Sequence, residues 1–357
     1  MRIVFLGLSI TSSWGNGHAT TYRGLVRELA GLGHDVLFLE RDVPWYANQR
    51  DLPRPPYGRT ELYASRADLE ARFTEDVREA ALIVVGSYVP EGVEVGAWVQ
   101  RTARGVTAFY DIDTPVTLAK LARGDFEYLS PELIPGYALY LSFTGGPMLE
   151  HIERELGSPA ARPLYCSVDP ELYLPTARAP DWDLGYLGTY SDDRQPVLDT
   201  LMLEAARRWS EGRFVVAGPQ YPAALVWPGN VQRIEHLPPP EHATFYNAQR
   251  FTLNVTRADM VRAGYSPSVR LFEAAACGVP IISDAWEGLE TFFTPGSEIF
   301  IARSPEETLG YLRELPDAER RQAGTRARER VLKEHTARHR ALTLIQYVNT
   351  LRGVRAS

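Results

Sequence analysis

The sequence predicts an α/β protein made of two doubly wound parallel-sheet domains. Short apolar runs alternate with longer amphipathic segments, a pattern typical of parallel strands covered by helices. The alternation is interrupted once, at residues 167–182, and then starts again. With 357 residues, the chain is long enough to bury two cores. We therefore expect two Rossmann-like domains that face each other, with a ligand cleft at the carboxyl ends of both sheets.

The first domain is expected at residues 1–166. Its predicted strands are the short apolar runs at residues 2–9, 34–40, 81–87, 106–111 and 137–143. Amphipathic spacing predicts helices between them, at residues 19–30, 67–80, 114–122 and 145–156. Strands and helices thus alternate, as parallel pairing requires.

Prolines and polar residues at 167–182 predict a linker, and the second domain is expected at residues 183–335. Its predicted strands are residues 184–189, 213–218, 251–255, 279–283 and 298–302. Helices are expected at residues 195–209 and 241–248, and residues 316–352 are almost wholly helical in pattern.

Composition excludes several classes of protein. The net charge of −7 argues against nucleic acid as the main partner, and no apolar run is as long as a transmembrane segment. The chain opens on a strand rather than a signal peptide, and its two cysteines lie in apolar segments, which together predict a cytoplasmic protein with reduced thiols. Residues 319–340 contain more basic than acidic side chains. They are expected to form a solvated helix face, with a peripheral membrane contact as the alternative.

The most informative motif is GYSPSVRLFEAAACGVPIIS, at residues 264–283. It predicts a helix capped by Ser266 and ended by Gly278, followed by a buried strand. The free N–H groups at the start of such a helix can bind an anion. Arg270, in the first turn, adds a planar, positively charged guanidinium. Glu273 follows on nearly the same face, where it could accept ribose hydroxyls. The alternatives are a salt bridge for Arg270 and an arginine partner for Glu273.

This motif, with LNVTR at 253–257 and SVDPELYLP at 167–175, resembles the donor-binding core of GT-B glycosyltransferases, specifically the CgeB-like (spore-maturation protein-like) group. The resemblance covers most of the second domain and the first domain in outline. It implies that a nucleotide sugar binds the second domain and an acceptor the first, and that a C-terminal helix at 336–357 packs on the first domain. Many retaining members carry two glutamates eight residues apart. Glu273 fits the second, but Tyr265 stands at the first, which leaves the stereochemical outcome open.

Donor contacts are predicted on the loops that follow the second-domain strands. A glycine at a strand end allows close ligand approach, arginines bind phosphate, and acidic residues accept hydrogen bonds from sugar hydroxyls. The resemblance adds backbone contacts to the nucleobase at His236 and Leu237. The predicted donor-binding residues are Gly188, Arg194, His236, Leu237, Thr256, Arg257, Ser266, Ser268, Arg270, Glu273, Glu287 and Gly288. Arg194 could equally belong to a plain surface loop.

Acceptor-side candidates follow the first-domain strands. His18 or Asp111 could act as base on the acceptor hydroxyl, while helix capping and packing are the alternatives for His18 and for Asp113. Asp111 and Asp113 form an Asp-x-Asp pair, but a parallel-sheet chain argues against the metal chemistry of that motif, so no metal is expected. The predicted acceptor-side residues are Gly15, Gly17, His18, Asp113, Gly145 and Gly146.

The sequence therefore predicts a metal-independent, hexosyltransferase-type enzyme that uses a nucleoside-diphosphate sugar and needs no cofactor. Arg270 would stabilise the leaving diphosphate. The acceptor could be a small molecule, a glycan, a lipid or a protein. A nucleotide-sugar 2-epimerase-like isomerase and a non-catalytic nucleotide-sugar binding subunit are the alternatives. A dehydrogenase is disfavoured, because no Gly-x-Gly-x-x-Gly turn follows the first strand.

Overall fold

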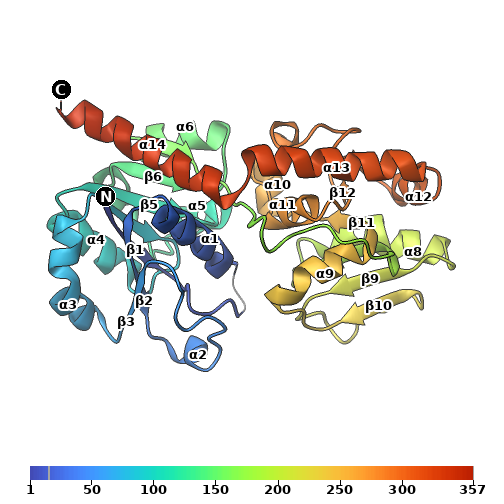
Figure 1. Cartoon of the computed structure of the whole chain (residues 1–357), viewed down its shortest axis with the longest axis horizontal. Helices are drawn as coiled ribbons and strands as arrows, with labels where there is room; N and C mark the ends of the chain where they lie inside the picture. Colours follow the sequence, from blue (N-terminus) through green and yellow to red (C-terminus); the bar gives the residue numbers. More distant parts are fainter. Residues whose placement is uncertain (15–16, 357) are drawn as a thin grey trace. The chain divides into compact units, whose positions relative to one another are not determined.

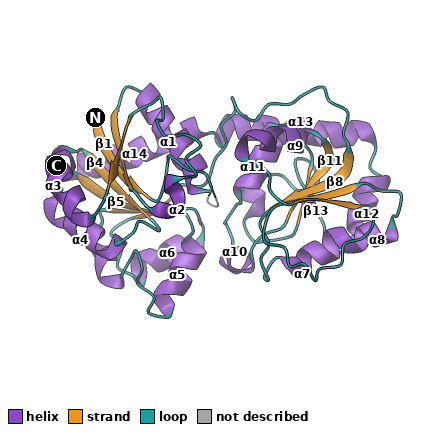
Figure 2. Cartoon of the chain, turned by 90° about the horizontal axis from the view of Figure 1, so that it is seen from below, coloured by secondary structure: helices purple, strands orange, loops and turns teal. Residues whose placement is uncertain are grey.

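The computed structural model describes residues 1–14 and 17–356. The chain divides into two compact units: unit 1 comprises Met1–Cys166 and Ala337–Ser357, and unit 2 comprises Ser167–Thr336. In each unit, helices lie on the faces of a single parallel sheet (Figure 2).

Unit 1 contains a seven-stranded sheet in the order β3-β2-β1-β4-β5-β6-β7. Its strands are β1 (Arg2–Gly7), β2 (Asp35–Arg41), β3 (Arg59–Tyr63), β4 (Leu82–Gly86), β5 (Val106–Asp111), β6 (Leu139–Ser142) and β7 (Ala161–Pro163). The strand order reverses between β1 and β4, which pair in parallel, so their carboxyl ends flank a topological switch point. The sequence did not predict β3 and β7, because edge strands lack a continuous apolar run.

The helices of unit 1 are α1 (His18–Gly31), α2 (Pro44–Ala47), α3 (Arg66–Glu79), α4 (Gly92–Thr102), α5 (Thr114–Ala122), the 3-10 helix η1 (Pro131–Gly136), α6 (Pro147–Arg154) and α14 (Ala337–Ala356). The C-terminal helix α14 packs beside α1 (Figure 1). It adds Ala341, Leu344 and Val348 to the core beneath the sheet. Gly24 permits the close approach, since a Cβ there would lie 3.0 Å from the Cβ of Ala337.

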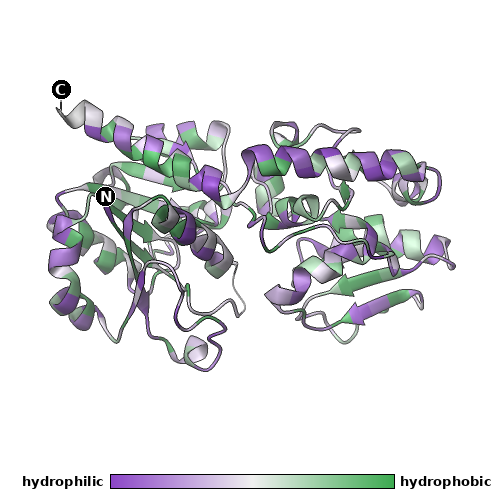
Figure 3. Ribbon diagram, viewed as in Figure 1, coloured by the Kyte–Doolittle hydropathy of each residue, from purple (hydrophilic) through white to green (hydrophobic). Residues whose placement is uncertain are grey.

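Unit 2 contains a six-stranded sheet in the order β10-β9-β8-β11-β12-β13, again parallel. Its strands are β8 (Trp182–Leu187), β9 (Phe214–Ala217), β10 (Val231–Ile234), β11 (Gln249–Asn254), β12 (Ile281–Ser283) and β13 (Phe300–Ile301). The switch point lies between β8 and β11, which pair side by side. The inner strand β9 is hydrophobic, whereas the edge strand β10 is partly hydrophilic and α13 (Asp317–Glu334) is mainly hydrophilic (Figure 3).

The other helices of unit 2 are α7 (Gln195–Leu198), the π-helical turn η2 (Asp199–Leu203), α8 (Glu204–Arg208), η3 (Pro239–Glu241), α9 (His242–Asn247), α10 (Ala258–Ala263), α11 (Val269–Ala276), η4 (Leu289–Thr291) and α12 (Pro305–Arg313). The predicted helix at 195–209 is thus an α-helix with a π turn in its middle. The segment expected to be a linker packs within unit 2, because Val168 pairs with Thr336 and Tyr173 is buried. No helix in the described part of the chain has both the length and the apolarity to cross a membrane.

Candidate functional site

Helix α11 begins two residues later than the sequence predicted. Its N-cap residue is Ser268, so the prediction that Ser266 caps it is wrong; Ser266 is buried in the preceding loop. The Ser268 hydroxyl does not cap the helix either, but donates to Asn254 Oδ1 at 2.8 Å. The amide groups of the first turn therefore have no side-chain cap from Ser268. The predicted stop at Gly278 is confirmed by its positive φ of 69°.

Arg270, in the first turn of α11, is held in place by the strand ends beside it. Its Nε donates to the Leu187 carbonyl at 2.7 Å and its Nη1 to Asn254 Oδ1 at 2.9 Å. The guanidinium lies over the Tyr186 ring, 4.8 Å from the centroid. Nη2 makes no hydrogen bond with any described residue, and the predicted alternative of a salt bridge is not found among them. The Arg270 side chain is thus fixed with one donor group left over.

Gly188 is needed for this arrangement. A Cβ at Gly188 would lie 2.9 Å from Arg270 Nη2 and 2.6 Å from the Tyr186 hydroxyl. The glycine therefore makes room for the stacked arginine, a packing reason that the sequence prediction of close ligand approach did not include.

Arg194 lies close enough to Arg270 and to Arg257 for both charges to act on it. Arg194 precedes α7 and donates from Nη2 to the Thr189 carbonyl at 2.7 Å, while its buried Nε has no hydrogen bond with a described residue. Burial lowers the pKa of Arg194, and the charges of Arg270 and Arg257 lower it further. Arg257 follows β11, with its Nε 3.9 Å from an Asp193 carboxylate oxygen. The three cations outnumber the carboxylates of Asp193 and Asp284 near them, which leaves excess positive charge that suits a polyanionic ligand.

A buried polar network lies beneath the arginine cluster. Asp284 accepts hydrogen bonds from the backbone N–H of Thr256 at 3.1 Å and from its hydroxyl at 2.8 Å. Asn254 Nδ2 donates to Thr256 and to Ser283 at 3.1 and 2.9 Å. Burial raises the pKa of Asp284. The network therefore places Thr256 in a supporting position and orients Asn254 toward Arg270.

Glu273 lies one turn deeper in α11 and is 5% exposed. One carboxylate oxygen accepts from the Tyr173 hydroxyl at 2.7 Å, and the other from the Tyr246 hydroxyl at 3.0 Å. His242 Nδ1 lies 3.9 Å from the second oxygen. Glu273 is therefore not the partner of an arginine, the alternative left open by the sequence. The three neighbours were missed because each stands far from Glu273 in the sequence, and nothing in the SVDPELYLP segment that contains Tyr173 indicates a contact with α11.

The remaining donor candidates lie on loops at the same edge of the sheet. His236 is exposed after β10, and the Leu237 carbonyl lies 3.2 Å from His242 Nε2. Glu287 and Gly288 follow β12, and the Glu287 carbonyl accepts from the backbone N–H of Tyr265 at 2.6 Å. The structure thus collects all twelve predicted donor residues on unit 2, around the carboxyl ends of its strands and the start of α11.

In unit 1, His18 opens α1 after the Gly17 N-cap. Its ring meets the Tyr88 ring edge to face, with centroids 5.3 Å apart. Nδ1 is buried and has no hydrogen-bond partner among the described residues, and burial lowers the pKa of His18 to about 4. The imidazole is therefore neutral at pH 7 and able to accept a proton. Gly15, the other predicted glycine of this loop, lies outside the described residues.

The two aspartates after β5 have different surroundings. Asp111 is fully buried and accepts from Thr117 Oγ1 at 2.6 Å and from the Tyr140 hydroxyl at 2.5 Å. Burial raises the pKa of Asp111 to about 6. Asp113 is half-buried and accepts from the Tyr88 hydroxyl at 3.2 Å. It is the N-cap residue of α5, but its side chain makes no capping hydrogen bond. The geometry thus favours His18 over Asp111 as an acceptor-side base, with Tyr88 contacting both His18 and Asp113.

Gly145 and Gly146 form the turn between β6 and α6. A Cβ at Gly145 would lie 1.9 Å from the Tyr165 hydroxyl, and Gly146 has a φ of 59°. Both glycines are therefore required sterically, whether or not an acceptor binds there. Within residues 1–14 and 17–356, no group of three or more His, Cys, Asp or Glu side chains could hold a metal ion.

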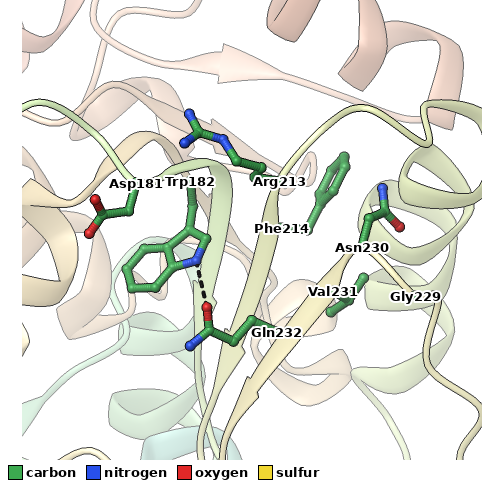
Figure 4. Close-up of a pocket in the computed structure, with 8 residues that line it drawn as sticks. All are labelled: Asp181, Trp182, Arg213, Phe214, Gly229, Asn230, Val231 and Gln232. Carbon is green, nitrogen blue, oxygen red and sulfur yellow. Dashed lines mark hydrogen bonds between the residues drawn. The ribbon is translucent and has the colours of Figure 1, made fainter.

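A pocket of about 450 Å³ lies at the opposite edge of the unit 2 sheet, at the amino ends of β8, β9 and β10 (Figure 4). It is lined by Asp181, Trp182, Arg213, Phe214, Gly229, Asn230, Val231 and Gln232. Trp182 Nε1 donates to Gln232 at 3.0 Å, and Asn230 Nδ2 donates to three backbone carbonyls. Because these polar groups already have partners and ligands of such sheets bind at carboxyl ends, this pocket is not the candidate site.

Comparisons with known proteins agree with this fold. A family model described as "Glycosyl transferase-like" matches residues 194–346. No curated protein sequence shows a significant match. Sucrose-phosphate synthase from Thermosynechococcus elongatus aligns with a TM-score of 0.72 and 17% identity over 99% of both chains.

Two other solved structures are similar over nearly their whole length. Anabaena Alr3699/HepE in complex with UDP aligns with a TM-score of 0.73 and 12% identity, over 98% of this chain and 100% of that chain. An alpha-glucosyltransferase in complex with UDP and a 13-mer DNA aligns with a TM-score of 0.70 and 12% identity, over 98% and 99% of the two chains. The predicted GT-B glycosyltransferase fold is therefore confirmed. At such identities the similarity shows the fold alone.

Proposed function

We propose that this protein is a metal-independent glycosyltransferase that moves a sugar, of hexose type, from a nucleoside diphosphate to an acceptor hydroxyl. The arginine cluster of Arg194, Arg257 and Arg270 carries this proposal. A diphosphate leaving group gains negative charge as its bond to the sugar breaks, and fixed cations stabilise that charge most when they need no rearrangement. In this chain they would replace the divalent metal that other glycosyltransferases use.

The roles follow from the contacts of each side chain. Arg270 presents its unused Nη2 to the diphosphate, since Leu187 and Asn254 hold the rest of its guanidinium. Glu273, already bonded to two tyrosine hydroxyls, has acceptor capacity left for a ribose hydroxyl. In unit 1, the neutral His18 imidazole takes the proton that the acceptor hydroxyl loses when its oxygen bonds to the sugar.

UDP-sugars are the first donors to test, because similar structures were solved with UDP and with UDP-glucose. The acceptor stays open among small molecules, glycans, lipids and proteins. Membership of the CgeB-like group remains a prediction. We also infer a reducing compartment such as the cytoplasm, since Cys166 and Cys277 are both buried free thiols.

A donor panel tests the proposal. Thermal shift with uridine, guanosine, thymidine and cytidine diphosphates and their sugars should single out one nucleotide, since a specific ligand stabilises in proportion to its occupancy. Calorimetry with Arg270→Ala should then show that nucleotide binding roughly 30-fold weaker, from about 2 kcal/mol for a charge-assisted hydrogen bond. Arg320→Ala is the control, because Arg320 belongs to α13 and bonds to Asp317 and the Arg250 carbonyl. If no nucleoside diphosphate binds the wild-type protein, the proposal fails.

Incubating the protein with its donor, with and without an acceptor, distinguishes a glycosyltransferase from the two alternative functions. The isomerase alternative predicts a new epimer when the protein is incubated with its donor and no acceptor. A non-catalytic subunit would bind the donor tightly and neither hydrolyse nor transfer the sugar with any acceptor. The glycosyltransferase proposal expects no epimer, and transfer that depends on an added acceptor.

A further inference from the structure

Helix α1 buries two polar atoms that have no hydrogen-bond partner in the described part of the chain. They are Nδ1 of His18 and the hydroxyl oxygen of Tyr22. The two residues are four positions apart, so they lie on the same face of the helix, with Cβ atoms about 6 Å apart. Most buried polar side-chain atoms in folded proteins are hydrogen-bonded, so two neighbouring exceptions need a physical explanation.

The Tyr22 hydroxyl lies at the end of β4. The Tyr22 ring packs against Phe5 and Phe38, with centroid distances of 6.2 and 5.0 Å. A Cβ on Gly86, the last residue of β4, would lie 1.9 Å from the hydroxyl oxygen. Aromatic side chains on a helix point back toward its N-terminus, which is the end of α1 that begins with His18. The hydroxyl is therefore directed toward the turn that carries the histidine.

The His18 ring lies beside the same strand end. It meets the ring of Tyr88, two residues after Gly86, with centroids 5.3 Å apart. Both His18 Nδ1 and the Tyr22 oxygen are buried, so bulk solvent does not reach either atom. The two atoms therefore lie close together at the carboxyl end of β4, and each needs a partner from within the protein interior.

The proposed role of His18 decides which of its ring nitrogens carries the hydrogen. A neutral imidazole has one N–H group and one nitrogen with a free lone pair. Because Nδ1 is buried, an acceptor hydroxyl can give its proton only to Nε2, which must then hold the lone pair. Nδ1 consequently carries the hydrogen and is a buried donor that needs an acceptor. The Tyr22 oxygen is an acceptor on the same face of the helix, and it is not used by any described residue.

We propose that Tyr22 is a positioning residue for His18, and that one buried water molecule accepts a hydrogen bond from Nδ1–H and donates one to the Tyr22 oxygen. Buried waters commonly join polar groups that have no other protein partner. This bridge holds the imidazole in the form whose lone pair lies on Nε2, as a base requires. The inference rests on the proposed function, because it takes the form of the ring from the role of His18 as base.

Nitrogen NMR of the full chain with labelled histidines tests the bridge, because the ring signals show which nitrogen carries the hydrogen. The chain has seven histidines, and the signals of His18 are those that disappear in His18→Asn. At neutral pH the wild-type protein should show the Nδ1–H form. Tyr22→Phe keeps the packed ring and should shift the ratio of the two forms about fivefold toward Nε2–H, the value for one neutral hydrogen bond. Tyr63→Phe is the matched control and should leave the His18 signals unchanged, since its buried hydroxyl also has no described partner but lies on β3.

An Nε2–H form of His18 in the wild-type protein would overturn the inference, and this result does not depend on how well any variant folds. An unchanged ratio in Tyr22→Phe, or an equal shift in Tyr63→Phe, would overturn it as well. The spectra need neither donor nor acceptor, so their outcome is separate from that of the donor panel. Failure of the wild-type protein to bind any nucleoside diphosphate would remove the proposed function, whereas only the His18 spectra can remove the bridge to Tyr22.

Discussion

Asp111 provides a prediction whose size follows from the structure. Its carboxyl is fully buried at the end of β5, and burial raises its pKa from 3.8 to about 6. Because the folded state binds the proton more tightly than the unfolded state, stability falls as pH rises through this window. The difference between these two pKa values corresponds to roughly 3 kcal/mol of unfolding free energy, which the protein keeps below pH 4 and has lost at pH 7.

Asp111→Asn removes the titration and keeps the shape of the side chain. The asparagine oxygen can still accept from Tyr140, and its amide can donate to Thr117, whose hydroxyl also contacts Tyr128. Wild-type stability should therefore decline between pH 4 and pH 7 relative to the variant, by about 3 kcal/mol. The assay is urea denaturation of both proteins at several pH values, in which the other titrating groups cancel in the difference.

The same experiment separates two roles for Asp111. A carboxylate that faces an acceptor in solvent would titrate near its usual pKa, and the two stability profiles would run parallel. Parallel profiles together with a complete loss of transfer in the variant would contradict the buried, supporting role assigned here. Retained transfer at pH 7 would agree with it and leave His18 as the base.

Four further predictions test the site more briefly. Gly188→Ala should weaken nucleotide binding about tenfold in calorimetry. The added Cβ would lie 2.9 Å from Arg270 Nη2 and would therefore displace the guanidinium. Tyr173→Phe should lower stability toward urea by about 1 kcal/mol, since it removes a hydrogen bond to the buried Glu273. His18→Asn should reduce transfer at least about 100-fold with nucleotide affinity unchanged. Wild-type transfer should decline as pH falls through about 4, where His18 becomes protonated.

Much of the fold could be predicted from the sequence, because interior strands of parallel sheets are continuous apolar runs. The runs at β1, β4 and β5 are of this kind, and helix α5 was predicted with its observed bounds. The edge strand β3 was missed because its residues, Arg59–Tyr63, are polar and mostly half-exposed. Edge strands bury less apolar surface than interior strands, so their sequences are less often continuous apolar runs.

The candidate donor residues could be named from the helix motif and from the loops that follow the strands, whereas their hydrogen-bond partners could not. Arg270 and Glu273 follow from the helix motif, since their spacing is set within a single element. Asp284, Tyr173 and Tyr246 complete their surroundings from distant parts of the chain, and only the folded topology brings them together. The N-cap was misplaced for a local reason: Ser266 and Ser268 flank Pro267, and sequence preference alone fits either serine.

In both units, buried polar side chains with hydrogen-bond partners lie at the carboxyl ends of the strands. In unit 2, the buried pair of Asn254 and Asp284 is bonded to its neighbours and holds Arg270, which leaves one donor group unused. In unit 1, buried Asp111 is bonded to its neighbours, while Asp113, two residues on, is only half-buried. A buried polar group without partners would be costly, and Asp111, Asn254 and Asp284 each have hydrogen-bond partners. Rigid support of this kind fixes the reacting groups before a ligand arrives, and such preorganisation is the main source of electrostatic stabilisation in enzymes.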